Sequence, residues 1–371
     1  MIDNSIYVTR PLLPDLESVN EELKEIWASQ KVTNAGPKHN LLEDKLREEL
    51  KVPNVSLFNN GTMALLTALK ALDLPFDSEV ITTPFTFAAT PHCISWNGLS
   101  PVFCDIEPNT MCINPDEIEK HITEKTSAIL GVHVYGFPCQ VEKIQKIADK
   151  YGLKVIYDGA HVFSTEINGE GIGNFGDITM FSFHATKLFN TIEGGCLSYK
   201  DEALKRKIYN LRNFGIRSEE VVEDIGINGK MNEIQAVIGL LNLKQYRDEQ
   251  EKRRVLKEFY DSELKNVSGI RILEMPAGTT NSYQYYPIVI EDDYQLSRDE
   301  LYNKLRTVGI YARKYFYPLC SDYLPYKDLP SSNPENLPVA NEYKNRVLCL
   351  PFYGSLEKTY RIRVCKEIKS V

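Results

Sequence analysis

The sequence predicts a doubly wound α/β fold followed by a smaller α+β region. Between about residues 40 and 200, short and continuously apolar runs alternate with stretches of helical periodicity. Such runs are typical of parallel strands that helices cover on both faces. After residue 230 the pattern changes to one long helical stretch and then to further strand candidates. We therefore expect a mostly parallel seven-stranded sheet flanked by helices, with a smaller C-terminal α+β domain.

Seven apolar segments are the candidates for the strands of the sheet. They are NVSLF (54–58), EVITT (79–83), PVFCD (101–105), SAILGVHV (127–134), KVIYD (154–158), ITMFSF (178–183) and GCLSY (195–199). Helical periodicity lies between most of them, as over 63–71, 115–121 and 140–151. This alternation predicts parallel neighbours joined by crossover helices.

The C-terminal part begins with a single long helical pattern over 232–265, apolar at first and strongly charged later. Such a helix suits a connector that leaves the core. The strand candidates beyond it are GIRILEM (269–275), YQYYPIVI (283–290) and GIYARKYFYPL (309–319), with a helix over 297–307 between the last two. We expect a large domain over 1–249, which includes the N-terminal segment, and a small α+β domain over 250–371.

The composition of the chain excludes some classes of binding partner and indicates the cellular compartment. The chain of 371 residues carries 43 Lys and Arg against 51 Asp and Glu, a net charge of −8, without a basic cluster. This argues against binding to nucleic acid or to an anionic membrane. No segment approaches the roughly 18 apolar residues of a membrane span, and no signal peptide is evident, so we expect a cytoplasmic protein. The eight cysteines lack CxxC spacing and mostly lie in apolar runs such as VLCLPF, which predicts buried free thiols.

Polar residues follow several strand candidates where each strand ends, and ligands gather at that edge of an open parallel sheet. The turn 59–62 (Asn-Asn-Gly-Thr) precedes an apolar helix, so it is either an anion site at a helix N-terminus or a plain cap. The glycine-containing loop 226–233 opens the long helix and is either a ligand loop or a simple helix start.

Asp158 and Lys187, two charged residues at this edge, each have a structural and a catalytic interpretation. Asp158 ends an apolar strand, where its carboxylate needs a partner: a protonated pyridine nitrogen, a turn that it caps, or a metal shared with His161. Lys187 is either a surface lysine or, if desolvated, a nucleophile that forms imines with carbonyl compounds. Each residue alone favours the structural interpretation. Their occurrence together favours groups directed at a phosphate, a ring and an aldehyde.

Seven motifs stand in the order and spacing of one known family. They are GTMAL, TPFTFAAT, VHVYGFP, IYDGAH, FSFHATK, EGG and GINGKMNEIQA. Over about residues 30–320 the chain resembles the DegT/DnrJ/EryC1/StrS family, which are sugar aminotransferases of fold type I that depend on pyridoxal-5′-phosphate (PLP). A lone GT or GG would mean nothing, but the set of seven is specific. The resemblance implies PLP as cofactor and a homodimer with shared active sites.

The resemblance also implies a role for each matching residue. Lys187 matches the lysine that is joined to the cofactor aldehyde and moves the substrate proton, and Asp158 matches the acid on the pyridine nitrogen. His161 matches the position beside the ring oxygen, and Phe87 matches the aromatic that stacks on the ring. The matches to phosphate-binding positions are Gly61, Thr62, Ser182 and, for the phosphate of the neighbouring subunit, Asn228. Many relatives have Ala where this chain has Gly159, a change that loosens the backbone and removes no chemistry.

By the same resemblance, the amino donor is L-glutamate and the acceptor is a nucleotide-linked keto sugar. We expect dTDP-4-keto-6-deoxy-D-glucose to be converted into dTDP-4-amino-4,6-dideoxy-D-glucose for surface polysaccharide (O-antigen); a 3-keto isomer and a UDP or GDP carrier are the alternatives. The stretch YARKYFYPL resembles the segment that lines the sugar-nucleotide pocket, although an edge strand with solvated charges explains it equally well. Its candidate substrate-binding residues are Arg313, Lys314, Tyr315 and Tyr317.

Three other classes of function fit less well. A non-catalytic regulator would leave Lys187 unexplained, and the chain lacks a helix-turn-helix segment. A desulfurase needs a reactive cysteine in a mobile loop, and none of the eight is obviously so placed. A metal-dependent hydrolase built on Asp158, His161 and His184 lacks the usual ligand spacings, so we expect no metal site.

Overall fold

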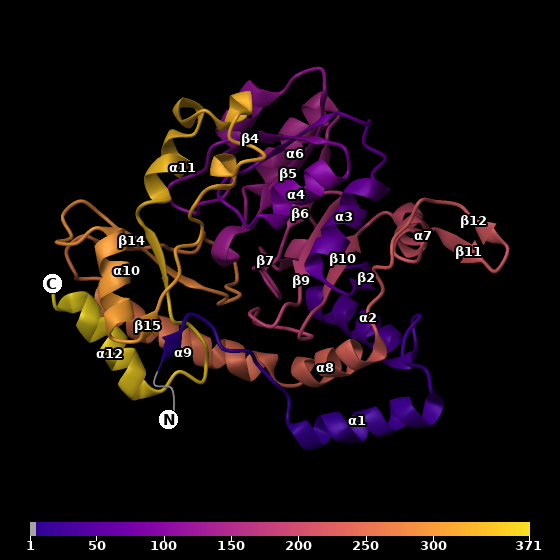
Figure 1. Cartoon of the computed structure of the whole chain (residues 1–371), viewed down its shortest axis with the longest axis horizontal. Helices are drawn as coiled ribbons and strands as arrows, with labels where there is room; N and C mark the ends of the chain where they lie inside the picture. Colours follow the sequence, from indigo (N-terminus) through magenta and orange to yellow (C-terminus); the bar gives the residue numbers. More distant parts are fainter. Residues whose placement is uncertain (1–4) are drawn as a thin grey trace.

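A computed structural model describes residues 5–371 and contains the predicted sheet (Figure 1). Its seven strands follow the order β2-β10-β9-β6-β5-β3-β4, and β10 alone runs antiparallel to its neighbours. The strands are β2 (Asn54–Phe58), β3 (Glu79–Thr82), β4 (Ser100–Phe103), β5 (Thr126–Val132), β6 (Lys154–Asp158), β9 (Ile178–Ser182) and β10 (Gly195–Tyr199). All seven strand candidates and the predicted fold class are thus confirmed.

Adjacent residues of the central strands enter two different apolar clusters, which explains their continuous hydrophobicity. In β9, Met180 belongs to one cluster and Phe181 to the other; in β10, Leu197 and Cys196 divide in the same way. Because side chains alternate along a strand, both faces of the sheet are buried. The helices connected with this sheet are α2 (Pro37–Leu50), α3 (Gly61–Ala71), α4 (Ala89–Trp96), α5 (Pro115–Ile118), α6 (Val141–Tyr151), α7 (Glu202–Leu211) and α8 (Glu233–Leu243).

The C-terminal part has its own apolar cluster around a three-stranded antiparallel sheet of order β13-β14-β16. Its elements are α9 (Tyr246–Leu264), β13 (Ile270–Ile272), β14 (Tyr286–Ile290), α10 (Arg298–Thr307), α11 (Pro338–Tyr343), β16 (Val347–Leu350) and α12 (Lys358–Lys369). The N-terminal strand β1 (Ile6–Tyr7) pairs in parallel with β15 (Ile310–Tyr311), and Ile6 is buried in this same cluster. Strand β1, before α1 (Leu16–Ser29), therefore packs against the C-terminal part of the chain.

Two of the predicted elements were wrong. The helix expected over 232–265 breaks between α8 and α9, where Gln245 leaves the helical conformation and its side chain donates a 2.8 Å hydrogen bond to Asn242 Oδ1. Buried Asn242 is held by the carbonyl of Asn190, so a tertiary contact decides the break. The strand expected over 309–319 is reduced to β15. The third strand of the small sheet is β16, which lies in the apolar run VLCLPF.

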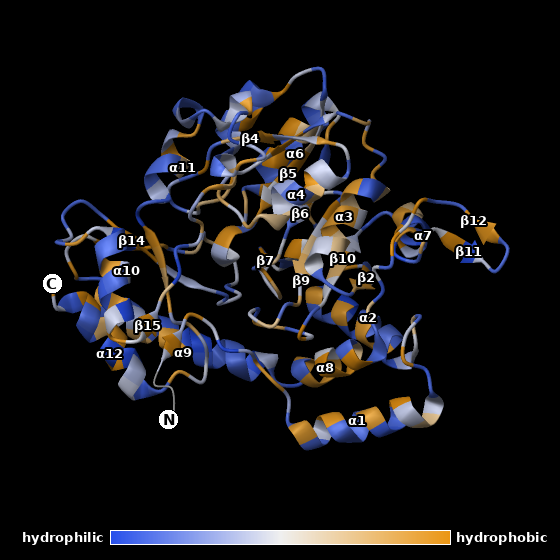
Figure 2. Cartoon of the chain, viewed as in Figure 1, coloured by the Kyte–Doolittle hydropathy of each residue, from blue (hydrophilic) through white to orange (hydrophobic). Residues whose placement is uncertain are grey.

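Apolar residues are concentrated in the central strands and in α3, whereas α9 is largely polar (Figure 2). The hairpin of β11 (Ile216–Ser218) and β12 (Val221–Val222) projects from the body of the molecule (Figure 1). A further small hairpin joins β7 (Glu166–Ile167) to β8 (Glu170–Gly171). All eight cysteines are buried and free, as predicted. Over residues 5–371 no helix is long and apolar enough to cross a membrane.

Candidate active site

Lys187 lies five residues beyond the end of β9, in a tight turn in which its amide donates a 2.8 Å hydrogen bond to the carbonyl of His184. Burial of its ammonium lowers the pKa of Lys187 to about 8, although the negative charge of Asp158 acts in the opposite direction. Nζ lies 5.8 Å from the centre of the Tyr285 ring. At neutral pH, Lys187 is then a neutral amine in roughly a tenth of the protein molecules, and only the neutral amine attacks carbonyl groups.

Asp158 ends β6 beside Met180 of β9, so strand register brings it to the edge from which Lys187 leaves. Its side chain is 6% exposed and accepts hydrogen bonds from Thr90 Oγ1 (3.0 Å) and from the amide of Ala160 (3.1 Å). Burial raises the pKa of Asp158, while these donors and the charge of Lys187 lower it. A buried carboxylate held by neutral donors suits a cationic ligand, because such a ligand supplies the missing counter-charge.

His161 lies three residues after Asp158 in the chain, and its buried imidazole packs against the rings of Tyr285 and Phe316. Its Nδ1 accepts a 3.1 Å hydrogen bond from the amide of Tyr135, so the neutral ring carries its proton on Nε2. Burial, reinforced by the charge of Lys187, lowers the pKa of His161 well below its usual value. Tyr135 adopts a left-handed backbone conformation (φ 58°), which aims its amide at the imidazole. Within residues 5–371 no group of three or more His, Cys, Asp or Glu side chains is placed to hold a metal ion.

The turn between β2 and α3 forms a close cradle. Asn60 caps α3 by accepting a 2.8 Å hydrogen bond from the amide of Met63, so the first-turn amides that point out of the helix towards an anion are those of Gly61 and Thr62. A Cβ at Gly61 would lie 3.1 Å from Cβ of Ser182, and Gly195 approaches Gly61 from the adjacent strand. Thr62 is exposed at this turn. The structure thus brings Gly61 close to Ser182, with Thr62 next in the chain, and the phosphate-binding role of the three residues stays a prediction.

Phe87 lies in the loop between β3 and α4, and its ring is 64% exposed. The same loop is tied to Asp158 by two hydroxyl groups: Thr86 Oγ1 lies 2.9 Å from Thr90 Oγ1, which bonds to the carboxylate. These contacts tie the backbone beside Phe87 to the strand end that carries Asp158. The stacking role of Phe87 stays a prediction.

Known proteins resemble this chain over its whole length. Residues 15–369 match the model of the DegT/DnrJ/EryC1/StrS aminotransferase family. The chain is 45% identical to a dTDP-4-amino-4,6-dideoxy-D-glucose transaminase of Escherichia coli, covering 99% of this chain and 98% of that protein. A transaminase of the same name from Shigella dysenteriae is 43% identical, with coverage of 99% and 100%. The crystal structure of DesI with its TDP-sugar product superposes with a TM-score of 0.93 at 32% identity, covering 99% of this chain and 93% of DesI.

The chain belongs to the DegT/DnrJ/EryC1/StrS aminotransferase family. Enzymes of this family depend on PLP, and the residues at the sheet edge fit that cofactor. Lys187 supplies a desolvated amine, Asp158 a buried carboxylate without a salt bridge among residues 5–371, and Gly61 a cradle that a Cβ would fill. The predictions of an aminotransferase and of its cofactor are therefore confirmed.

The loop that carries Asn228 lies against the cradle within the same subunit. The amide of Asn59 donates to the carbonyl of Gly229 (2.8 Å), and the amide of Gly229 donates to the carbonyl of Arg212 (2.9 Å). The side chain of Asn228 is exposed, so its predicted contact with a neighbouring subunit's phosphate stays a prediction.

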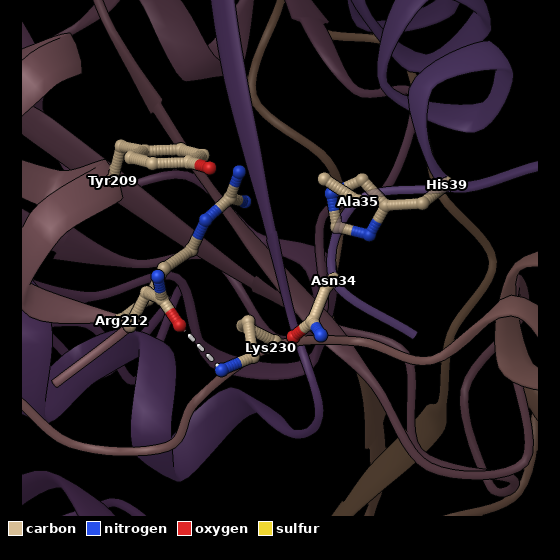
Figure 3. A pocket seen from close by; sticks show the side chains of 7 residues that line it. Asn34, Ala35, His39, Tyr209, Arg212 and Lys230 are labelled. Carbon is tan, nitrogen blue, oxygen red and sulfur yellow. Dashed lines mark hydrogen bonds between the residues drawn. The ribbon is translucent and has the colours of Figure 1, made fainter. Parts of the chain in front are cut away.

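Behind this loop lies a polar hollow into which the guanidinium of Arg212 points (Figure 3). Arg212 is 4% exposed and donates from Nη1 to Glu43 Oε1 and to the carbonyl of Leu57, both at 2.8 Å. The hollow is lined by Asn34, Ala35, His39, Tyr209, Arg212, Asn213 and Lys230. The ion pair with Glu43 thus fixes Arg212, whose carbonyl holds the loop of Asn228.

This ion pair predicts a loss of stability in acid. Burial of Glu43 would raise its pKa, but the hydrogen bond from His39 and the charges of Arg212 and His39 outweigh burial and lower it to about 2. Because the folded pKa lies below the unfolded value of 4.5, the stabilisation is complete above pH 4.5 and is lost as the pH falls towards 2. It amounts to about 3 kcal/mol at neutral pH.

The measurement is urea unfolding of the wild type and of Glu43→Gln between pH 6 and 3. We expect the variant to be less stable at pH 6 and to lose less stability on acidification. Glu48→Gln, an exposed position on the same helix, is the matched control and should follow the wild type. If the free energy of unfolding fell equally with pH in the wild type and in Glu43→Gln, the Glu43 carboxylate would not be the cause of the acid sensitivity.

The segment 313–317 reaches the site with its aromatic residues rather than with its charges. Tyr315 packs edge-on against Tyr285 with ring centres 5.4 Å apart, and its carbonyl accepts a hydrogen bond from the Tyr135 hydroxyl. Lys314 is paired with Asp299 at 2.7 Å, while Arg313 is exposed and its backbone bridges to Cys349. Tyr317 is 49% exposed. The substrate roles of Arg313, Lys314, Tyr315 and Tyr317 stay predictions.

Three residues of the site were missed as individual contacts. Thr90 and Tyr135 stand inside motifs that identify the family, TPFTFAAT and VHVYGFP, so an inspection of these motifs for donors to Asp158 and His161 would have found them. Tyr285 lies in a segment whose sequence predicts only a strand, and nothing local signals its place near Lys187.

Proposed function

We propose that the protein transfers the amino group of L-glutamate to dTDP-4-keto-6-deoxy-D-glucose and forms dTDP-4-amino-4,6-dideoxy-D-glucose. The observation that carries the proposal is full-length identity of 45% and 43% to two transaminases named for that product. We further propose that this reaction serves the synthesis of a surface polysaccharide such as O-antigen in the cytoplasm. The boundary between a large domain (1–249) and a small one (250–371) belongs to the same proposal.

Each residue of the site has a separate role in the proposed reaction. Bound PLP supplies an aldehyde that captures the amino group and a ring that takes up electron density from the substrate carbon. Lys187 holds the cofactor and moves the proton at that carbon, because its amine is desolvated and partly neutral. Asp158 keeps the ring nitrogen protonated. Gly61, Thr62 and Ser182 bind the phosphate at the N-terminus of α3, and His161 and Phe87 hold the ring in place.

Surface apolar residues support the proposal of a homodimer. The hairpin β11–β12 and the loop after it expose Val221 (42%), Val222 (67%) and Ile225 (89%). Exposed apolar clusters of this kind mark interaction sites. The hairpin leads directly into the loop of Asn228, so a second subunit that covered the hairpin would lie beside this loop.

The test is a substrate panel with the purified, PLP-loaded protein. Glutamate is incubated with dTDP-, UDP- and GDP-linked keto sugars, and each product is identified by mass and NMR. We expect amination of the dTDP-4-keto sugar at C4 with the release of 2-oxoglutarate. Preferential amination at C3, or of a UDP or GDP sugar, would replace the proposed acceptor.

The pKa of Lys187 predicts how the protein takes up its cofactor. Only the neutral amine reacts with an aldehyde, so the rate at which added PLP attaches to the cofactor-free protein should rise with pH and level off above about 8. The rise in visible absorbance after rapid mixing measures this rate. A rate that continues to rise tenfold per pH unit up to pH 10 would show that Lys187 behaves as an ordinary lysine.

A further inference from the structure

The side chain of Gln284 brackets Lys187 from a distant part of the chain. Its Oε1 accepts a 2.8 Å hydrogen bond from the amide of Leu188, and its Nε2 donates a 3.1 Å hydrogen bond to the carbonyl of Thr186. Both peptide groups that flank Lys187 are therefore held by one carboxamide. Gln284 is 2% exposed, and only a carboxamide offers this acceptor and this donor side by side.

Ser282 and Tyr285, on either side of Gln284, both contact His161. Ser282 Oγ donates a 2.6 Å hydrogen bond to the carbonyl of His161, and both side chains are buried. The ring of Tyr285 meets the His161 imidazole edge-on at 5.0 Å and lies 5.8 Å from Lys187 Nζ. The segment 282–285 thus touches Lys187 and His161 at once, although it precedes a strand of the small C-terminal sheet.

A buried ion pair fixes the same segment from behind. Arg253 is fully buried and donates from Nη1 to the carbonyl of Tyr283 (3.3 Å) and from Nε to Glu249 (2.7 Å). The other contact of Glu249 is the amide of Gly354, at 2.7 Å. Since α9 carries both charged residues, the segment is held on a regular helix and not on a mobile loop.

We infer that Gln284 is a positioning residue that sets the orientation of Lys187 towards the cofactor aldehyde. This inference rests on the proposed role of Lys187. Without the carboxamide, the turn 184–188 keeps its covalent path but loses both fixed peptide groups, so the amine samples directions that miss the aldehyde. The effect is on geometry around the amine and not on the affinity for the sugar.

The test compares Gln284→Met, which keeps the volume and removes both hydrogen bonds, with Gln250→Met. Gln250 bonds to Ser164 and to the carbonyl of Asn281, so it makes the same kind of contact beside the same segment without touching the peptides around Lys187. For each PLP-loaded protein we would measure the pH midpoint of the visible absorbance, hydrogen exchange at the amide of Leu188, and kcat and KM.

For Gln284→Met we expect a shift of the absorbance midpoint by about half a pH unit or more, exchange at Leu188 that is at least about tenfold faster, and a fall in kcat with KM nearly unchanged. Gln250→Met should match the wild type. An unchanged midpoint and exchange rate in folded Gln284→Met would overturn the inference, as would the same changes in both variants.

Should Gln284→Met fail to fold, wild-type exchange still decides the matter, because an amide of Leu188 that exchanged as fast as a free loop would rule out the bracket. Absence of any lysine-bound visible absorbance in the wild type would instead refute the proposed role of Lys187. The two failures are thus distinguishable.

Discussion

Replacing Lys187 with alanine is expected to abolish transamination. General acid–base catalysis alone contributes about 10²–10⁴-fold, and the substitution also removes the covalent anchor of the cofactor, so turnover should fall below detection. The visible absorbance that marks the lysine-bound cofactor should disappear as well. Single-turnover assays with glutamate and absorbance spectra of the reconstituted variant measure the two effects separately.

Lys154→Ala is the matched control for this substitution. Lys154 begins β6, the strand that ends with Asp158, but its ammonium is half-exposed and pairs with Asp177 at 3.2 Å. Its loss should leave both absorbance and turnover near the wild-type level. Normal transamination by Lys187→Ala would exclude the role proposed for this amine, whatever the control shows.

The core of the fold could be predicted from the sequence because both faces of its sheet are buried. Each strand then appears as an uninterrupted apolar run, and the polar residue that ends the run marks the edge where ligands bind. Asp158 and Gly61 could be placed in this way. Lys187 follows the next apolar run, ITMFSF, but that its strand β9 lies beside β6 is seen only in the structure.

The remaining features depend on contacts between distant segments. Nothing local distinguishes Lys244 and Gln245 from good helix formers, and the break after α8 is set by Asn242 reaching Asn190. The run 309–319 is rich in aromatic residues, as strands are, yet Phe316 packs against Phe85 and Tyr135 instead of entering a sheet. The hydrogen bond between the Leu188 amide and Gln284 joins residues that are almost a hundred positions apart, so no local sequence pattern predicts it.

Asp158→Asn is expected to cost nearly as much activity as the loss of the lysine while leaving the fold intact. Asparagine keeps the shape of the side chain but removes the charge that holds a ring nitrogen protonated. Loss of one preorganised electrostatic group costs about 3–4 kcal/mol of transition-state stabilisation, which corresponds to a fall in kcat of about 10²- to 10³-fold. Lys187 remains, so the variant should still bind PLP with visible absorbance.

Thr90→Val supplies the graded comparison for Asp158→Asn, because it removes one neutral donor to the carboxylate and keeps the charge. A hydrogen bond to a charged group contributes about 1.5–3 kcal/mol, so we expect a loss of roughly ten- to a hundredfold in kcat. Burial raises the pKa of Asp158, and losing the Thr90 donor should raise it further. The acidic limb of the pH–rate profile should therefore move to higher pH in Thr90→Val. An Asp158→Asn enzyme with wild-type kcat would show that this carboxylate does not act on the ring.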